Sequence, residues 1–235
     1  METPVTYQKS SKVDSSDCRL EWLVLSQVPL IRGYLGDCMD LMASTADNHY
    51  DLVLADPPYG NKDAIDIKNS RNHSANRKEY RQFKNIAPNI KYFDELRRVS
   101  KNQIIWGGNW FGIPGGYICW NKNGTLFGEA ELAYNSMINS VRIYEYTWNG
   151  MIQQNMSDKE QRIHPTQKPV ALYRWLLKNY VKAGQRILDT HGGSFSSAVA
   201  CHTEGFEMDI IEIDEEYYNA GIKRFKEATC QLKIF

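Results

Sequence analysis

The sequence Asp51-Leu52-Val53-Leu54-Ala55-Asp56-Pro57-Pro58-Tyr59 decides the fold of this chain, because it joins a short apolar strand to a rigid polar turn. The run from Asp51 to Ala55 predicts a buried strand, and two successive prolines cannot continue its hydrogen-bond ladder. Asp56 therefore directly follows the carboxyl end of this strand. In an open α/β sheet, ligands bind at that end.

The four residues after the strand suit an aromatic amine. Proline has no N–H and a fixed φ, so the carbonyl oxygens of Asp56 and Pro57 stay free to accept hydrogen bonds. An exocyclic amine has two N–H donors, and Asp56 and the Pro57 carbonyl can each accept one. Pro58 adds stiffness, and Tyr59 offers a ring for stacking. The alternative is a proline-stiffened strand exit with a solvated aspartate, and these four residues alone do not separate the two.

Length and charge limit the classes of protein. The chain has 235 residues, which fits one α/β domain with a small insertion. Its formal net charge is zero, but eleven Lys or Arg residues stand against five acidic residues between Lys62 and Lys101. Between His202 and Ile222 there are seven acidic residues and no Lys or Arg. This asymmetry predicts one basic region that faces a polyanion, or else ordinary solvated faces.

Cysteine spacing and hydropathy indicate the compartment. The five cysteines form no C-x-x-C pair and none has a histidine at metal-ligand spacing, so we expect reduced thiols and no metal. No stretch approaches the roughly 20 apolar residues that cross a bilayer. The polar N-terminus does not resemble a signal peptide. We therefore expect a soluble, cytoplasmic protein with no membrane partner.

Hydrophobic patterns predict an alternation of strands and helices. Residues 1–18 are polar and predict a flexible tail, whereas 19–235 predict a single domain. We expect strands over 19–28, 31–35, 51–55, 103–106, 117–120, 141–148, 186–189 and 206–213. We expect helices over 39–42, 86–99, 170–180, 197–202 and from 215 onward. Glu129 and Glu131 are expected in a short helical or irregular piece.

The segment 60–85 is basic and lacks apolar periodicity. Tyr80 and Phe83 are interleaved with its cations, a composition that suits phosphate contacts and base stacking. We therefore expect a loop that orders on nucleic acid. Its candidate phosphate-binding residues are Arg71, Arg77, Lys78, Arg81 and Lys84.

Two later motifs suit a nucleotide ligand. The helix expected from Val170 follows His164-Pro165-Thr166-Gln167-Lys168-Pro169, and Pro169 suits its first turn. The free N–H groups at the helix start, beside Lys168, either bind a carboxylate or phosphate or form an ordinary helix cap without a ligand. The strand ending at Asp189 leads into a Gly-rich turn and a helix, an order typical of nucleotide binding. Glu212 lies about 20 residues past that turn, where a carboxylate can accept from ribose hydroxyls. Asp214 does the same or caps the next helix, and Asp37 either faces a nucleotide or only caps its helix.

In their order along the chain, these motifs resemble the β-class amino-group DNA methyltransferases, and most closely the small phage-type N6-adenine enzymes of restriction-modification. Asp56-Pro57-Pro58-Tyr59 comes first, His164 to Pro169 follows, and the Asp189 turn and Glu212 come last. The resemblance covers roughly 31–224. It implies an α/β fold with a seven-stranded Rossmann-like methyltransferase sheet, a circularly permuted motif order and a small recognition insertion at about 121–158. The strand ending at Asp189 would lie beside the strand ending at Ala55.

The resemblance also implies roles for single residues. Asp56, Pro57, Pro58 and Tyr59 would be catalytic, with Asp56 orienting the amine of a flipped adenine and Tyr59 stacking on the base. S-adenosylmethionine would be the cofactor and double-stranded DNA the partner. The protein would act in a bacterial or phage-infected cell, and a homodimer is compatible with the resemblance. The residues implied in cofactor binding are Asp37, Cys38, Asp56, His164, Thr166, Lys168, Asp189, His191, Gly193, Ser194, Glu212 and Asp214.

One position departs from the family pattern. The turn usually reads Asp-x-Phe-x-Gly-x-Gly, whereas His191 and Phe195 stand at the aromatic and second-glycine positions here. We expect Phe195 to put a Cβ and a ring where backbone approaches the cofactor. A nucleic-acid-binding homologue that methylates weakly is therefore the alternative to an active enzyme. N4 of cytosine in DNA and N6 of adenosine in RNA are alternative substrates, because each presents a comparable amine.

Overall fold

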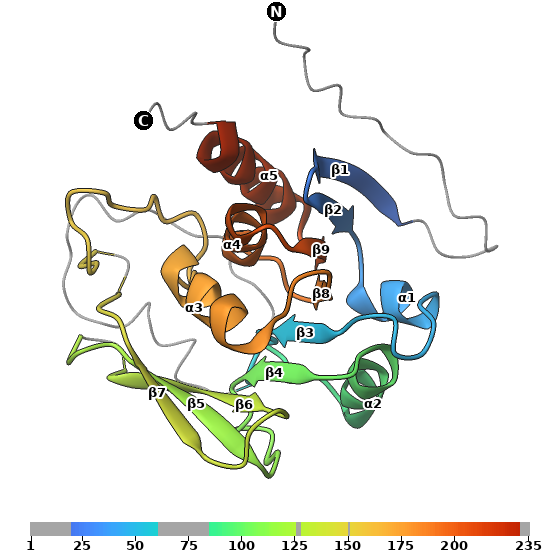
Figure 1. Ribbon diagram of the computed structural model, residues 1–235, viewed down its shortest axis with the longest axis horizontal. Helices are drawn as coiled ribbons and strands as arrows, with labels where there is room; N and C mark the ends of the chain where they lie inside the picture. Colours follow the sequence, from blue (N-terminus) through green and yellow to red (C-terminus); the bar gives the residue numbers. More distant parts are fainter. Residues whose placement is uncertain (1–19, 61–84, 126–127, 150, 231–235) are drawn as a thin grey trace, which may run out of the picture.

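The computed structural model describes residues 20–60, 85–125, 128–149 and 151–230. Within these residues, nine strands form a single sheet with helices on both faces (Figure 1). The strands are β1 (Glu21–Gln27), β2 (Leu30–Leu35), β3 (Leu52–Ala55), β4 (Gln103–Trp106), β5 (Gly116–Asn121), β6 (Ala130–Asn135), β7 (Val141–Glu145), β8 (Arg186–Asp189) and β9 (Glu207–Glu212). The helices are α1 (Cys38–Ala43), α2 (Ile90–Val99), α3 (Val170–Tyr180), α4 (Ser196–Glu204) and α5 (Glu215–Cys230).

The order of strands across the sheet is β1-β2-β9-β8-β3-β4-β6-β5-β7. β3 pairs in parallel with both β4 and β8, and Leu54 lies opposite Asp189. From β3 the chain proceeds to β4 on one side, and from β8 it proceeds to β9 on the other. The boundary between β3 and β8 is therefore the topological switch point, where such sheets bind ligands. This placement of the two strand ends confirms the expectation from the sequence.

Apolar residues on both faces of the central strands explain the layered arrangement. All four residues of β3 and all four of β4 are buried, as parallel strands covered on both faces require. On one face, α1 and α2 contribute the buried residues Leu41, Met42, Tyr92, Phe93, Leu96 and Val99. On the other, α3, α4 and α5 contribute Leu172, Leu176, Ala198, Val199, Ile222 and Phe225. Figure 1 shows α1 and α2 on the side of the sheet away from α4 and α5.

The sheet differs from the expected one in two respects. It has nine strands across the described residues, whereas the resemblance implied seven and the hydrophobic patterns predicted eight; β1 and β7 were among those eight, and β6 was not. The piece around Glu131 is the strand β6 and not a helical or irregular segment. Ala, Glu and Leu favour helices, but pairing of β6 with both β4 and β5 overrides that preference.

Some expectations fall outside the described residues. The tail expected over 1–18 and the five basic residues Arg71, Arg77, Lys78, Arg81 and Lys84 belong to segments that the structure does not describe. Residues 121–158, where a recognition insertion was expected, are described apart from residues 126, 127 and 150, and they hold β6 and β7.

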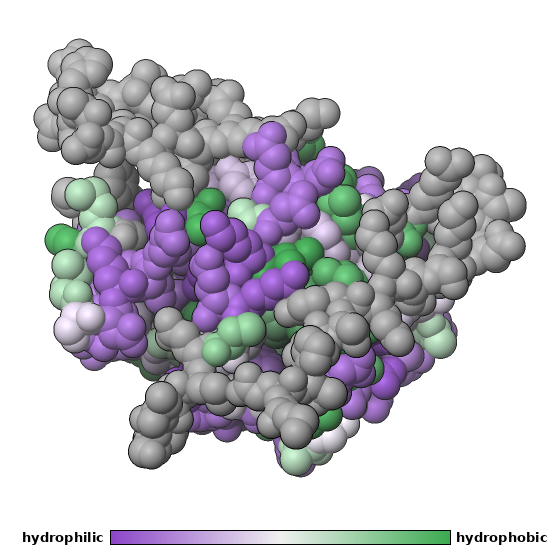
Figure 2. Space-filling view, turned by 90° about the horizontal axis from the view of Figure 1, so that it is seen from above, coloured by the Kyte–Doolittle hydropathy of each residue, from purple (hydrophilic) through white to green (hydrophobic). Residues whose placement is uncertain are grey.

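The surface of the described chain is ordinary for a folded domain. Hydrophilic side chains gather in the centre of the face seen from above, the side on which α5 lies in Figure 1 (Figure 2). None of the helices in the described ranges is both long and apolar enough to span a bilayer.

One carboxylate, that of Asp209, lies deep in the sheet. Asp209 on β9 is 2% exposed, and it lies directly opposite Arg32 of β2 in the parallel register. Both guanidinium donors reach its carboxylate, at 2.6 and 2.7 Å. The hydroxyl of Tyr50 donates a third hydrogen bond at 2.8 Å. Three donors therefore satisfy a carboxylate that would otherwise be costly to bury.

We predict that Arg32→Met lowers the free energy of unfolding by about 3 kcal/mol, because it leaves the Asp209 charge buried without its partner. Urea denaturation measures the loss. Arg97→Met is the matched control, since Arg97 pairs with Asp94 on the surface, and such pairs contribute about 0–1 kcal/mol. Equal losses in the two variants would contradict the prediction.

Candidate active site

The turn after β3 is fixed by a glycine on the neighbouring strand end. The hydroxyl of Tyr59 donates to Asp56 Oδ1 at 2.8 Å, so the aromatic ring folds back over its own carboxylate. The ring packs on Gly107, where a Cβ would lie 2.4 Å from ring atom Cε1. Gly107 also has φ +70°, in the left-handed region. Only glycine accepts both conditions, so Gly107 determines where Tyr59 lies.

The other oxygen of Asp56 is held by a lysine from a distant part of the chain. Lys168 precedes α3, and its Nζ lies 2.5 Å from Asp56 Oδ2. The same Nζ lies 3.2 Å from Oε2 of Glu131 on β6. Glu131 in turn accepts from Lys122, which follows β5. Lys168 is 4% exposed, and its ammonium group lies 5.0 Å from the centre of the Trp106 ring. Four alternating charges therefore run from the turn to β5.

The pKa directions show that the two central members of this chain, Lys168 and Glu131, are ionised. Burial lowers the pKa of Lys168, but Asp56 and Glu131 outweigh it and leave the pKa above its ordinary value. Burial raises the pKa of Glu131, yet the charges of Lys168 and Lys122 bring it down to about 2. At neutral pH, Glu131 is therefore a carboxylate that only accepts hydrogen bonds.

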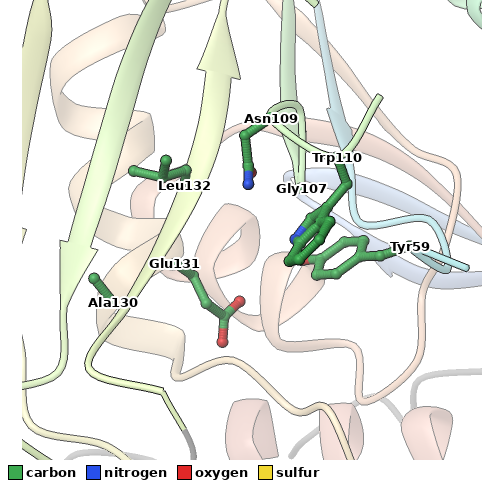
Figure 3. A pocket seen from close by; sticks show the side chains of 7 residues that line it. All are labelled: Tyr59, Gly107, Asn109, Trp110, Ala130, Glu131 and Leu132. Carbon is green, nitrogen blue, oxygen red and sulfur yellow. The ribbon is translucent and has the colours of Figure 1, made fainter. Parts of the chain in front are cut away.

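A cavity of about 320 Å³ lies beside Tyr59. We call it the Trp110 pocket, and its lining residues are Tyr59, Gly107, Asn109, Trp110, Ala130, Glu131 and Leu132. Figure 3 shows the rings of Trp110 and Tyr59 beside one another on one side and Glu131 on the other. Trp110 is 55% exposed, so its ring is available at the mouth of the pocket.

A second cavity of about 320 Å³ lies at the ends of β2, β8 and β9. We call it the Glu212 pocket, and its lining residues include Asp37, Cys38, Pro58, Tyr92, Thr190, His191, Glu212 and Ile213. Pro58 lines this pocket and Tyr59 lines the Trp110 pocket. The tetrapeptide from Asp56 to Tyr59 thus borders both cavities.

The Gly-rich turn after β8 is ordered by two carboxylates. Asp189 accepts from the His191 N–H at 3.0 Å and from the Ser197 hydroxyl. Burial raises its pKa to about 7, and these two donors limit the rise. Glu212 accepts from the Gly193 N–H at 2.7 Å and from the Asp214 N–H at 2.9 Å. Within the described residues, the Asp189 carboxylate accepts only from the turn and the start of α4. The Glu212 carboxylate accepts from the turn and also lines the Glu212 pocket.

The expectation for Phe195 was wrong. Its backbone is left-handed, with φ 58°, but its ring is fully buried and is not among the residues that line the Glu212 pocket. The ring packs against Gly221 of α5, where a Cβ would lie 2.5 Å from it. It also makes an edge contact with Tyr218. A glycine on α5 therefore makes room for the ring, and the cofactor side of the turn stays open.

Other residues expected to bind the cofactor have different partners. The structure places Lys168 against Asp56 and Glu131 rather than in the Glu212 pocket. The hydroxyl of Ser194 lies 3.0 Å from that of Ser196. Asp214 accepts from Glu216 N–H at the start of α5, which supports its capping role. For Lys168, Ser194 and Asp214, cofactor contact stays a prediction without support from their positions.

Two residues of the His164 motif lie at the edge of the turn. Thr166 is exposed, and its hydroxyl lies 3.1 Å from His164 Nδ1. The His164 ring packs on Tyr217, and a Cβ at Gly193 would lie 3.6 Å from it. Burial lowers the pKa of His164 to about 4, with Lys168 adding to the effect. A neutral imidazole therefore covers Gly193.

The wall of the Glu212 pocket holds two carboxylates, one lysine (Lys91) and otherwise uncharged side chains. Burial lowers the pKa of His191 to about 4 and raises that of Cys38 to about 12, so both are neutral at pH 7. His191 Nδ1 lies 3.0 Å from the Thr190 hydroxyl. Asp37 caps α1 by accepting from Met39 N–H at 2.9 Å, and it also lines the pocket. Both alternatives for Asp37 are thus compatible with its position.

The Glu212 pocket fits the cofactor that the resemblance implies. Its volume lies in the range of about 300–1,000 Å³ typical of small-molecule sites. The two acidic side chains can accept from ribose hydroxyls and an adenine amine, while Pro58 and Ile213 supply apolar walls. Within the described residues, no group of three or more metal-ligating side chains lies together.

Sequence reasoning missed the partners of Asp56. Glu131 was noted only as part of an irregular piece, and Lys122 was not singled out. An apolar alternation in Leu132 and Tyr134 was the available signal that 130–135 is a strand, and a strand would have placed Glu131 near the turn. Nothing in the composition of the Gly107-Gly108-Asn109-Trp110 turn connects it with Tyr59.

Comparisons with known proteins agree on one family. The family model described as DNA methylase, of the N6/N4 type, matches residues 121–223. The putative methylase YubD of Escherichia coli K12 is 26% identical over 211 residues, covering 80% of this chain and 87% of that protein. The type II methyltransferase M2.MboI of Moraxella bovis is 26% identical over 249 residues, covering 85% and 89%.

A solved structure shares the fold. The PvuII DNA methyltransferase, described as specific for cytosine N4, superimposes with a TM-score of 0.55 at 13% identity. The match covers 85% of this chain and 90% of that one. At this identity, the likeness shows the Rossmann-like methyltransferase fold alone.

We predict that Phe195→Ala lowers the free energy of unfolding by about 3–5 kcal/mol, because it empties a fully buried site. Urea denaturation measures the loss, and calorimetric titration measures cofactor binding at a temperature where the variant is folded. We expect no gain in affinity for S-adenosylmethionine. A large gain would mean that the ring does obstruct the cofactor.

Proposed function

We propose that this chain is an amino-group DNA methylase of the N6/N4 type and that it moves a methyl group from S-adenosylmethionine to the N6 amine of a flipped adenine. One observation carries the proposal: the tetrapeptide from Asp56 to Tyr59 forms a wall shared by two cavities. A cofactor in the Glu212 pocket and a base in the Trp110 pocket would meet at Asp56. Because an amine in duplex DNA lies within the base stack, the base must first be extruded.

The Glu212 pocket would hold the cofactor. When bound, S-adenosylmethionine supplies an electrophilic methyl group. The Glu212 carboxylate would accept from the ribose hydroxyls, since an ionised carboxylate has lone pairs beyond the two that Gly193 and Asp214 use. Asp37 would accept from the adenine amine of the cofactor. His191 and Cys38 would pack against the ligand as neutral groups.

The turn would orient the target amine. Asp56 Oδ1 and Oδ2 already accept from Tyr59 and Lys168, and the remaining lone pairs can accept one amine N–H. The Pro57 carbonyl can accept the other, which directs the nitrogen lone pair away from the turn. Asp56 then holds the positive charge that develops on nitrogen, and it or water receives the proton. Positioning and charge stabilisation are the main contributions of the protein.

We choose adenine over cytosine because an aspartate heads the tetrapeptide, as in the N6-adenine enzymes that the sequence resembles. Cytosine N4 is the alternative within the same family. Digestion of the methylated DNA to nucleosides, followed by mass spectrometry, separates N6-methyladenine from N4-methylcytosine. A product containing only N4-methylcytosine would overturn the choice.

We further propose duplex DNA as the partner and the cytoplasm of a bacterial or phage-infected cell as the location. Residues 121–158 would contact the bases that define the target sequence, and the basic residues of 60–85 would bind phosphates. A homodimer stays a prediction. These assignments rest on the family and on composition.

We predict that Asp56→Ala lowers kcat for methyl transfer by about 10²–10³-fold or more, because the amine loses the group that faces its developing charge. Transfer of a labelled methyl group to unmethylated duplex DNA measures the rate. Calorimetric titration is expected to show wild-type affinity for S-adenosylmethionine, since Asp56 does not line the Glu212 pocket. Asp94→Ala is the control, because Asp94 is exposed on α2. Full activity in Asp56→Ala would refute the mechanism.

We predict that Trp110→Ala raises KM for DNA about tenfold, because stacking of one base on an aromatic ring contributes about 1–3 kcal/mol. Initial rates at varied DNA concentration give KM, and Trp110→Phe is expected to retain most of the affinity. Val28→Ala serves as the control, since Val28 is also exposed, lines neither pocket and lies outside residues 121–158. An unchanged KM would remove Trp110 from the base site.

A further inference from the structure

Glu131 is the residue that connects the catalytic turn with the Trp110 pocket. It lines the pocket, and its Oε2 lies 3.2 Å from Lys168 Nζ. Lys168 in turn holds Asp56 Oδ2 at 2.5 Å. Figure 3 shows the Glu131 side chain reaching into the space between β6 and the Tyr59 ring. Glu131 belongs to none of the motifs identified in the sequence.

Lys168 by itself would serve the reaction poorly. Its ammonium group holds the Asp56 carboxylate in place, but a lone buried cation also repels the positive charge that forms on the amine nitrogen. A second carboxylate on the far side of Lys168 removes that penalty. Asp56, Lys168, Glu131 and Lys122 together carry two negative and two positive charges, so the cluster is neutral.

We propose that Glu131 is a positioning residue, which acts through Lys168 to hold the Asp56 carboxylate in place and which balances the charge of Lys168 during methyl transfer. Glu131 need not touch the reacting atoms for this role. The proposal deepens the function argued above and rests on it.

The pH dependence of the cluster follows from its neighbours. The titratable groups that interact with Lys168 are Asp56 and Glu131, which carry opposite charge, and His164. Tyr59, Lys122 and Tyr173 act on the two carboxylates. Among the described residues, only Asp56 and Glu131 are anionic partners within hydrogen-bond distance of Lys168. Loss of Glu131 therefore lets burial lower the affinity of Lys168 for its proton.

The first test is Glu131→Gln, which keeps the shape and removes the charge. We expect kcat for methyl transfer to fall about 100-fold, as small displacements of a catalytic group do, with KM for S-adenosylmethionine unchanged. The rate should also decline at a lower pH than in the wild type as Lys168 loses its proton. Glu227→Gln is the control, because Glu227 is exposed on α5 and lines neither pocket. A purely structural role would reduce the folded fraction without moving the pH profile.

The second test restores the charge balance. Lys122→Met in the Glu131→Gln background returns the cluster to neutrality, and methionine keeps an apolar chain over Trp120, where Lys122 now lies 4.7 Å from the ring centre. We expect the double variant to recover most of the lost rate. Failure to recover, together with an unmoved pH profile, would overturn the proposal.

A readout without activity separates this proposal from the proposed function. The Cε signal of Lys168, followed by lysine-selective NMR and assigned with Lys168→Met, should titrate about one pH unit or more lower in Glu131→Gln. An unchanged midpoint would overturn the coupling even if activity fell. A lowered midpoint in Glu131→Gln, together with a wild-type protein that transfers no methyl group, would instead refute the proposed function alone.

Discussion

The parallel pairing of β3 with β8 is the constraint on which the site depends. It places Leu54 opposite Asp189, so the proline turn and the Gly-rich turn leave the sheet side by side. The residues concerned lie more than 130 positions apart in the chain. The contacts of the site involve residues that follow these two strand ends. Lys168 contacts Asp56 after β3, and Glu212 contacts Gly193 after β8.

The two prolines give this arrangement a rigid partition. Pro58 faces one cavity and Tyr59 the other, while Gly107 fixes the ring of Tyr59 from the neighbouring strand. Because the partition has few soft dihedrals, two ligands on its sides would approach along one direction only. Fixed charges surround the place where the two ligands would meet: Lys168 contacts Asp56, Glu131 contacts Lys168, and Lys122 contacts Glu131.

Local patterns predicted much of the fold, whereas long-range contacts escaped them. The apolar runs at 51–55 and 186–189 and the cap at Asp37 depend on neighbours in sequence, and β3, β8 and α1 appear as expected. Residues 130–135 have a helical composition, and only their strand partners make them β6. Phe195 broke the glycine pattern, but its compensation lies at Gly221, 26 positions away, which no motif includes. The partner of Lys168 was missed for the same reason.

The ion pair of Arg32 with Asp209 has a consequence for how the chain assembles. Its two residues are 177 positions apart and face one another in a parallel pairing that no tight turn can align. A slip of β2 by one residue would move Arg32 to the opposite face of the sheet and leave Asp209 without a counter-ion in an apolar interior. Misaligned pairings of β2 with β9 are thereby penalised, and this buried polar contact acts as a selector of strand register during folding.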